Sequence, residues 1–63
     1  MRVLRFKQLR DRVGLSRSQI ERLEAVGRFP KRLRLGPGAV GWLESEVDAY
    51  IAERVRERDG EAA

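Results

Sequence analysis

The stretch that decides the fold runs from residue 14 to residue 23 and reads Gly14-Leu15-Ser16-Arg17-Ser18-Gln19-Ile20-Glu21-Arg22-Leu23. Ser16 and Gln19 have the spacing of a capping box, in which a hydroxyl and an amide satisfy backbone N–H groups left unpaired at a helix start. Ile20 and Leu23 then form an inward apolar stripe. Gly27 follows where a helix would end. We therefore predict a helix that begins at the Ser16 cap and ends at Gly27.

A second helical pattern lies directly upstream. Phe6, Leu9 and Val13 recur at helical spacing, and Gly14 follows at the position where a left-handed residue ends a helix. Lys7 is the expected N-cap, although lysine caps helices poorly. Because the two helices are joined by only a few residues around Gly14, the pattern predicts a helix-turn-helix.

The segment after Gly27 has the pattern of a β-hairpin. Residues 32–35 read Arg-Leu-Arg-Leu, residues 36–38 supply a Gly-Pro-Gly turn, and residues 39–43 return. The alternation predicts Leu33 and Leu35 on the core side and Arg32 and Arg34 on the side of solvent or a ligand. Trp42 is expected in the centre of the small core, with the aromatic residues Phe6, Phe29 and Tyr50.

A third helix is expected from Ser45, with Ser45 and Asp48 as its capping box. Its apolar stripe is expected to consist of Val47, Tyr50, Ile51 and Val55. The predicted fold class is mainly α with a small β-hairpin: a winged helix-turn-helix of three helices plus a wing. We expect residues 1–57 to form one winged helix-turn-helix domain and residues 58–63 to form a disordered C-terminal tail.

Charge is divided unevenly along the chain. Residues 1–41 carry eleven lysines and arginines against three acids, a net charge of +8, whereas residues 42–63 carry three arginines against seven acids, a net charge of −4. A basic body indicates a polyanionic partner such as double-stranded DNA, although a merely solvated charged surface would show the same composition.

Several function classes find no support in the sequence. The chain has no cysteine and no histidine, so the usual metal ligands and thiol chemistry are absent. No motif joins a nucleophile to a base, and capping explains the paired acids, so we expect neither an enzyme nor a cofactor or small-molecule ligand. No run is long and apolar enough for a membrane span, which leads us to expect a cytoplasmic protein.

The residues expected to contact DNA fall into two groups. The first turn or so of the second helix in a helix-turn-helix reaches base edges, where arginine suits guanine and glutamine suits adenine. The second group belongs to the approach to the wing and to its first strand, where basic side chains would follow phosphates. The alternative roles are surface solvation, strand-edge protection and, for Gln19, capping. The candidates are Arg17, Ser18, Gln19, Arg22, Arg28, Lys31, Arg32 and Arg34.

The order of several short motifs resembles the AlpA-type phage regulators over roughly residues 3 to 54. These motifs are GLSRSQIERL at 14–23, GRFPK at 27–31, LG at 35–36, VGW at 40–42 and SEVDAYI at 45–51. The resemblance implies a MerR-like winged helix-turn-helix related to phage excisionases. The chain departs from the family pattern in two places. Phe6-Lys7-Gln8 stands where family members commonly have Ser, Thr or Pro near the start of the first helix, and Glu21 replaces the usual Tyr or Trp of the second helix.

The resemblance implies a regulator of transcription in a prophage or mobile element, bound to sequence-specific sites in the bacterial nucleoid. One alternative is an excisionase, a recombination directionality factor that bends attachment-site DNA together with further copies on adjacent sites or an integrase. A second alternative is a protein-interaction adaptor that uses the acidic third helix.

Overall fold

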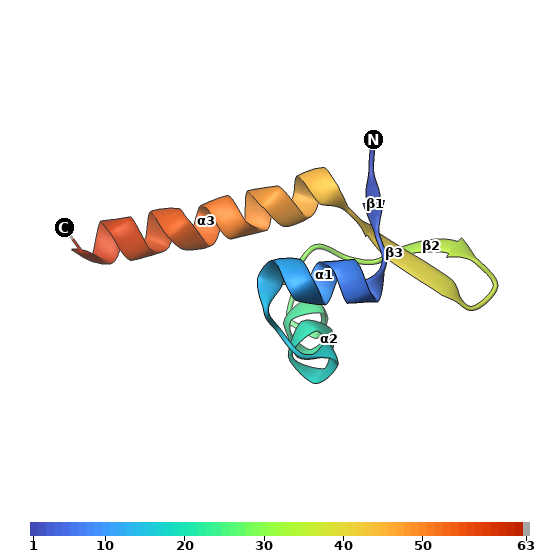
Figure 1. Cartoon of the computed structure of the whole chain (residues 1–63). Coiled ribbons are helices and arrows are strands. Elements are labelled where there is room, and N and C mark those ends of the chain that lie inside the picture. The colour runs from blue at the N-terminus through green and yellow to red at the C-terminus, as the bar shows by residue number, and fades with distance from the viewer. Residues whose placement is uncertain (63) are drawn as a thin grey trace.

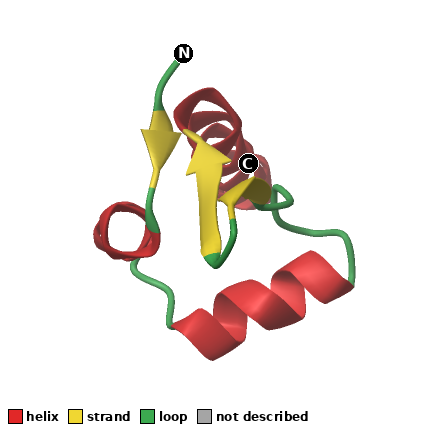
Figure 2. Ribbon diagram, turned by 90° about the vertical axis from the view of Figure 1, so that its right-hand side faces the viewer, coloured by secondary structure: helices red, strands yellow, loops and turns green. Residues whose placement is uncertain are grey.

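The computed structural model describes residues 1–62 and contains three helices and a small sheet. The elements are β1 (Val3–Leu4), α1 (Phe6–Val13), α2 (Arg17–Ala25), β2 (Leu33–Gly36), β3 (Ala39–Leu43) and α3 (Glu44–Ala62). The antiparallel sheet has the order β1-β3-β2. In Figures 1 and 2, α2 lies on the opposite side of the body from α3. The predicted mainly α fold with a hairpin is confirmed.

The predicted capping of α2 is present at both ends. The Gln19 backbone N–H donates to Ser16 Oγ at 3.2 Å, and the Ser16 N–H donates to Gln19 Oε1 at 2.9 Å. At the other end Gly27 has a φ of 74°, and the Arg28 N–H donates to the Leu23 carbonyl at 2.8 Å. This left-handed ending satisfies a carbonyl of the last turn and stops the helix.

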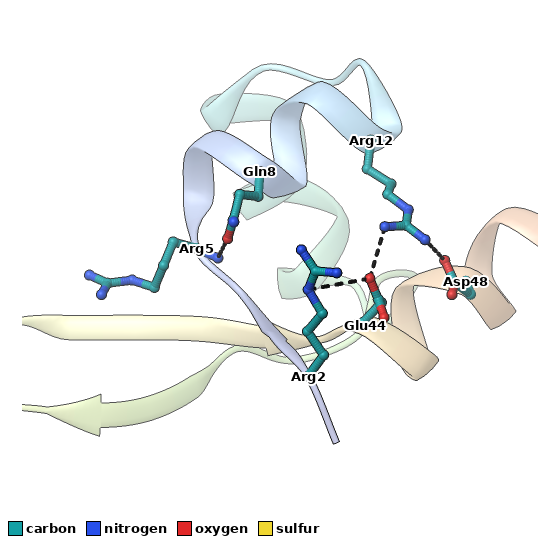
Figure 3. Close-up of polar contacts among 6 residues, drawn as sticks. All are labelled: Arg2, Arg5, Gln8, Arg12, Glu44 and Asp48. Carbon is teal, nitrogen blue, oxygen red and sulfur yellow. Dashed lines mark hydrogen bonds and ion pairs between the residues drawn. The ribbon is translucent and has the colours of Figure 1, made fainter.

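Helix α1 ends as predicted but begins earlier. Gly14 has a φ of 70°, and its N–H donates to the Arg10 carbonyl. The prediction that Lys7 is the N-cap is wrong, because α1 begins at Phe6 with Arg5 as its N-cap. The Arg5 backbone N–H donates to Gln8 Oε1 at 3.0 Å (Figure 3). The Gln8 amide thus supports the helix start, which Lys7 could not do.

The core lies where the helices meet the sheet. Its buried side chains are Leu4, Leu9, Ile20, Phe29, Trp42 and Val47. Trp42 is only 2% exposed, which confirms its expected place in the core. Phe29 meets Tyr50 edge to face, with ring centroids 4.8 Å apart, and this contact ties the loop before the wing to α3.

The wing differs from prediction in how its side chains are placed. The hairpin of β2 and β3 is present, but Leu35 is 46% exposed rather than in the core. The register shifts between Arg34 and Gly36, and the hairpin tip extends away from the helices (Figure 1), so no core surrounds Leu35. Arg32 precedes β2 and does not share an open basic face with Arg34.

Helix α3 follows β3 without a break. It begins at Glu44, whose N–H donates to the Arg2 carbonyl at 2.8 Å, so the predicted Ser45–Asp48 capping box is wrong. The chain passes directly from Leu43 of β3 into Glu44 of α3. Figure 1 shows that α3 projects well beyond the body. Val55 of the expected apolar stripe is 42% exposed, so the stripe is only partly covered. It continues across the expected domain boundary at residue 57 to Ala62, whereas Ala63 of the expected tail lies outside the described residues.

Candidate nucleic-acid interface

The exposed side of α2 carries the first group of predicted contact residues. Ile20 faces the core at 1% exposure, so its neighbours on the opposite side of the helix lie in solvent. Arg17, Ser18 and Arg22 are all exposed. Since α2 begins at Arg17, the structure brings two of these three residues into its first turn, where a helix-turn-helix reaches base edges.

Two of the α2 residues are engaged within the protein. The Arg17 guanidinium lies over the ring of Phe6, with Cζ 4.2 Å from the centroid. This cation–π contact holds the arginine at the end of α2 while leaving it exposed. The Gln19 side-chain oxygen is committed to the capping box. Arg22 makes no ion pair within the described residues and is therefore available to a ligand.

The second group of predicted contacts lies in the loop and wing, and Arg32 differs from the rest. Arg28, Lys31 and Arg34 are exposed and form no ion pair with any residue that the structure describes. Arg32 is directed to Glu24 near the end of α2, and Arg32 Nε lies 3.2 Å from each of the two carboxylate oxygens. Arg32 is thus bound within the protein, whereas its three neighbours are open to a ligand.

The contact between Glu24 and Arg32 changes the electrostatics of both groups. Partial burial raises the pKa of Glu24, but hydrogen bonds from the Arg32 side chain and backbone outweigh burial, so the pKa lies below its ordinary value. The hydrogen bond to Glu24 correspondingly raises the pKa of Arg32. The buried indole N–H of Trp42 makes no hydrogen bond in the described structure, but as a nearby donor it adds a smaller contribution that lowers the Glu24 pKa. Both groups therefore stay charged near neutral pH.

The cations on the α3 side of the molecule are compensated. Arg12 donates to Glu44 at 3.0 Å and to Asp48 at 2.8 Å, so it joins α1 to α3 (Figure 3). Arg2 also approaches Glu44, at 3.8 Å. Each arginine of α3 that lies in the described structure has an acidic neighbour on the same helix, in the pairs Arg54–Glu57, Arg56–Glu53 and Arg58–Asp59. Uncompensated positive charge is therefore concentrated on α1, α2, the loop and the wing.

Comparison with known proteins identifies the family of the chain. The sequence matches the family described as prophage CP4-57 regulatory protein (AlpA) over residues 2–55. The chain belongs to this AlpA family. The matched region contains every predicted contact residue, and the resemblance of the motifs to AlpA-type regulators is confirmed.

Two individual proteins are similar in sequence to this AlpA-family chain. It is 44% identical over 57 residues to the uncharacterized protein ORF88 of Enterobacteria phage P4, covering 90% of this chain and 65% of the phage protein. The chain therefore spans about two thirds of that relative's length. It is 31% identical over 64 residues to the DNA-binding transcriptional activator AlpA of Escherichia coli (strain K12), covering 89% of each chain.

The structure of this AlpA-family protein also exposes cations that the sequence reasoning missed. They are Arg5, Lys7 and Arg10, which are exposed and without ion pairs among the described residues. Figure 3 shows the Arg5 guanidinium extended away from Glu44. The first helix of a helix-turn-helix crosses the DNA backbone, and that geometry was the signal that could have identified them.

Other kinds of site are not apparent in the described part of the chain. No cluster of three or more potential metal-ligating side chains occurs there. Likewise, none of its helices combines the length and apolar character that a membrane crossing requires.

Proposed function

We propose that this protein is a sequence-specific, double-stranded DNA-binding regulator of transcription in a prophage or mobile element. The single observation that carries the proposal is the division of the cations. Those on the α3 side are paired with acids, whereas those on α2, the loop and β2 of the wing are exposed without such partners, apart from Arg32. An uncompensated basic surface around a helix-turn-helix suits a phosphate backbone.

In the proposed complex α2 enters the major groove. Arg17 and Ser18 lie at its start, and Arg22 lies one turn further on, within reach of a base or a phosphate. Arg28, Lys31 and Arg34 then contact phosphates beside the groove. The Escherichia coli relative is a DNA-binding transcriptional activator, which supports this function. The proposed location is the bacterial cytoplasm, on the nucleoid.

Selection of bound sites from random duplexes, followed by footprinting, tests this proposal. With about five phosphate contacts, log K should fall with log salt with a slope near −4 to −5. The footprint should show one major-groove contact and a flanking backbone contact. A salt-independent affinity, or no preference among duplexes, would contradict the proposal.

The same binding assay separates the two alternatives. Circularly permuted probes that reveal strong bending, with several copies stacked on one fragment, would favour an excisionase acting on attachment-site DNA. An absence of duplex binding even at low salt would favour a protein-interaction adaptor. A single occupied operator without strong bending is the result expected of the regulator.

A further inference from the structure

The end of the proposed reading helix is joined to the start of the wing by one carboxylate. Glu24 Oε2 accepts a hydrogen bond from the Arg32 backbone N–H at 3.0 Å. Both Glu24 oxygens also accept from Arg32 Nε, at 3.2 Å each, and Oε1 accepts from Nη2. Main chain and side chain of Arg32 are therefore fixed by the same group.

This contact is more enclosed than the other ion pairs in the part of the chain that the structure describes. The Glu24 side chain is 12% exposed and that of Arg32 is 34% exposed, whereas both partners of each ion pair within α3 are at least 49% exposed. The Arg32 guanidinium also lies over the buried Trp42 ring, with Cζ 5.3 Å from its centroid. The contact thus joins α2, the residue before β2, and β3.

A DNA phosphate that drew the Arg32 Nε and Nη2 groups away from Glu24 would break this arrangement. Glu24 would then remain partly buried without its cation, which is unfavourable for a carboxylate. If the unpaired Glu24 carboxylate then moved out into solvent, the Arg32 backbone N–H would lose its hydrogen-bond acceptor. Arg32 is therefore better suited to hold the wing than to contact the ligand.

We propose that Glu24 is a positioning residue which, through Arg32, fixes the orientation of the wing relative to α2 so that both contact one duplex. This inference rests on the proposed DNA-binding function. It assigns to Arg32 the role of an internal support and leaves the open contacts to Arg28, Lys31 and Arg34.

Glu24→Gln distinguishes a positioning role from a purely electrostatic one, because the two roles predict changes of opposite sign in the affinity for the selected site. Loss of a negative charge beside DNA would tighten binding to every duplex. Loss of positioning instead weakens binding to the selected site by about tenfold, equivalent to about 1.4 kcal/mol, while binding to unrelated duplex is unchanged or tighter. The quantity measured is the ratio of the two affinities at one salt concentration.

Glu21→Gln is the matched control. Glu21 lies one turn earlier on α2 and is exposed, and it influences Arg32 only through space, without a hydrogen bond. Its substitution removes the same charge from the same helix, so we expect equal or slightly tighter binding to both duplexes. An equal loss of specificity in the two variants would overturn the role of Glu24.

Arg32→Lys provides a second test that keeps the charge. Lysine lacks the planar fork that engages both Glu24 oxygens, so this variant should lose specificity as Glu24→Gln does. If Arg32 were a phosphate contact, lysine would retain most of the affinity. Retained affinity and specificity in Arg32→Lys would contradict the proposal.

A measurement without DNA distinguishes failure of this inference from failure of the proposed function. Backbone amide residual dipolar couplings report the orientation of β2 and β3 relative to α2 in the free protein. We expect Glu24→Gln to change that orientation while the couplings within each element stay as in the wild type. An unchanged orientation overturns the inference, whereas a changed orientation in a protein that binds no duplex overturns only the DNA-binding function.

Discussion

Arg17 and Arg34 carry the same charge but occupy different surroundings. Arg17 is held over Phe6 at the start of α2, where its fork can face a base, whereas Arg34 lies in β2 with no ionic partner among the described residues. A guanidinium held at a base edge gives discrimination, whereas an exposed one at the wing gives attraction to any phosphate. Removal of the two arginines should therefore affect DNA binding in different ways.

Arg17→Ala is expected to relax specificity at one base pair, at a cost of about 1–3 kcal/mol against the preferred base. Arg34→Ala should instead weaken binding to all duplexes by similar factors. Affinities for a set of single-base variants of the selected site measure both effects. Uniform weakening by Arg17→Ala would exclude base reading by this residue.

At the residue scale, local spacing predicted the capping of α2 and the left-handed glycines, because each depends on neighbours within a few positions. Exposure of Arg17, Ser18 and Arg22 followed from the inward position of Ile20. The engagement of Arg32 did not follow, since its partner Glu24 lies eight residues away across a loop. Alternation describes which side of a strand a residue occupies and carries no information about such a contact.

At the scale of elements, the junction of the three strands leaves little room for an added side chain at Gly41. Gly41 is buried in β3, next to β1 and β2. A Cβ atom at this position would lie 3.1 Å from the Leu4 carbonyl oxygen and 3.1 Å from Leu35 Cδ1, and would clash with Val3 Cγ1. A larger residue must therefore displace backbone as well as side chains.

Gly41→Ala is expected to lower the free energy of unfolding by about 1–3 kcal/mol, because the added methyl group overpacks the sheet. Urea denaturation followed by circular dichroism measures the change. Gly60→Ala is the matched control, since Gly60 lies exposed in α3 with nothing within 4 Å of an added Cβ atom. That variant should be unchanged or stabilised by up to about 1 kcal/mol through helix propensity. Equal stability of Gly41→Ala and the wild type would show that the strands can separate at little cost.

The sequence predicted the kind and order of the elements better than their limits. The hairpin and three helices follow from periodicity and turn residues, but α3 begins directly after β3 and needs no serine cap. Its first N–H is satisfied by the Arg2 carbonyl, a partner supplied by the far end of the chain. The exposure of Leu35 likewise depends on how far the hairpin extends past the core, which alternation does not reveal.

For the whole molecule, the arrangement of charge has a direct consequence for DNA affinity. The acids of α3 neutralise Arg12 and the arginines of α3 itself, so these cations add little to the attraction for phosphates. The division into a basic body and an acidic segment was visible in the sequence, but the pairing partners were not. Removal of a paired arginine should therefore change the salt dependence of DNA binding less than removal of an unpaired one.

Arg22→Ala is expected to reduce the magnitude of the salt slope by about 0.9 if Arg22 neutralises one phosphate. Arg56→Ala, which breaks an ion pair with Glu53 on α3, should leave the slope unchanged within error. Titrations of the same duplex at several salt concentrations provide the comparison. Equal reductions in the two variants would show that only total charge determines binding, and that the pairing has no effect.

The position of Trp42 makes it an intrinsic fluorescence probe of this protein. It is the single tryptophan of the chain, it is 2% exposed, and the Arg32 guanidinium lies over its ring. Indole emission depends on the polarity and charge of its surroundings, so a displaced Arg32 should alter its intensity, and unfolding should shift it to longer wavelength. A titration with unlabelled duplex, excited at the red edge of tryptophan absorption, would then report movement of the wing separately from loss of the core.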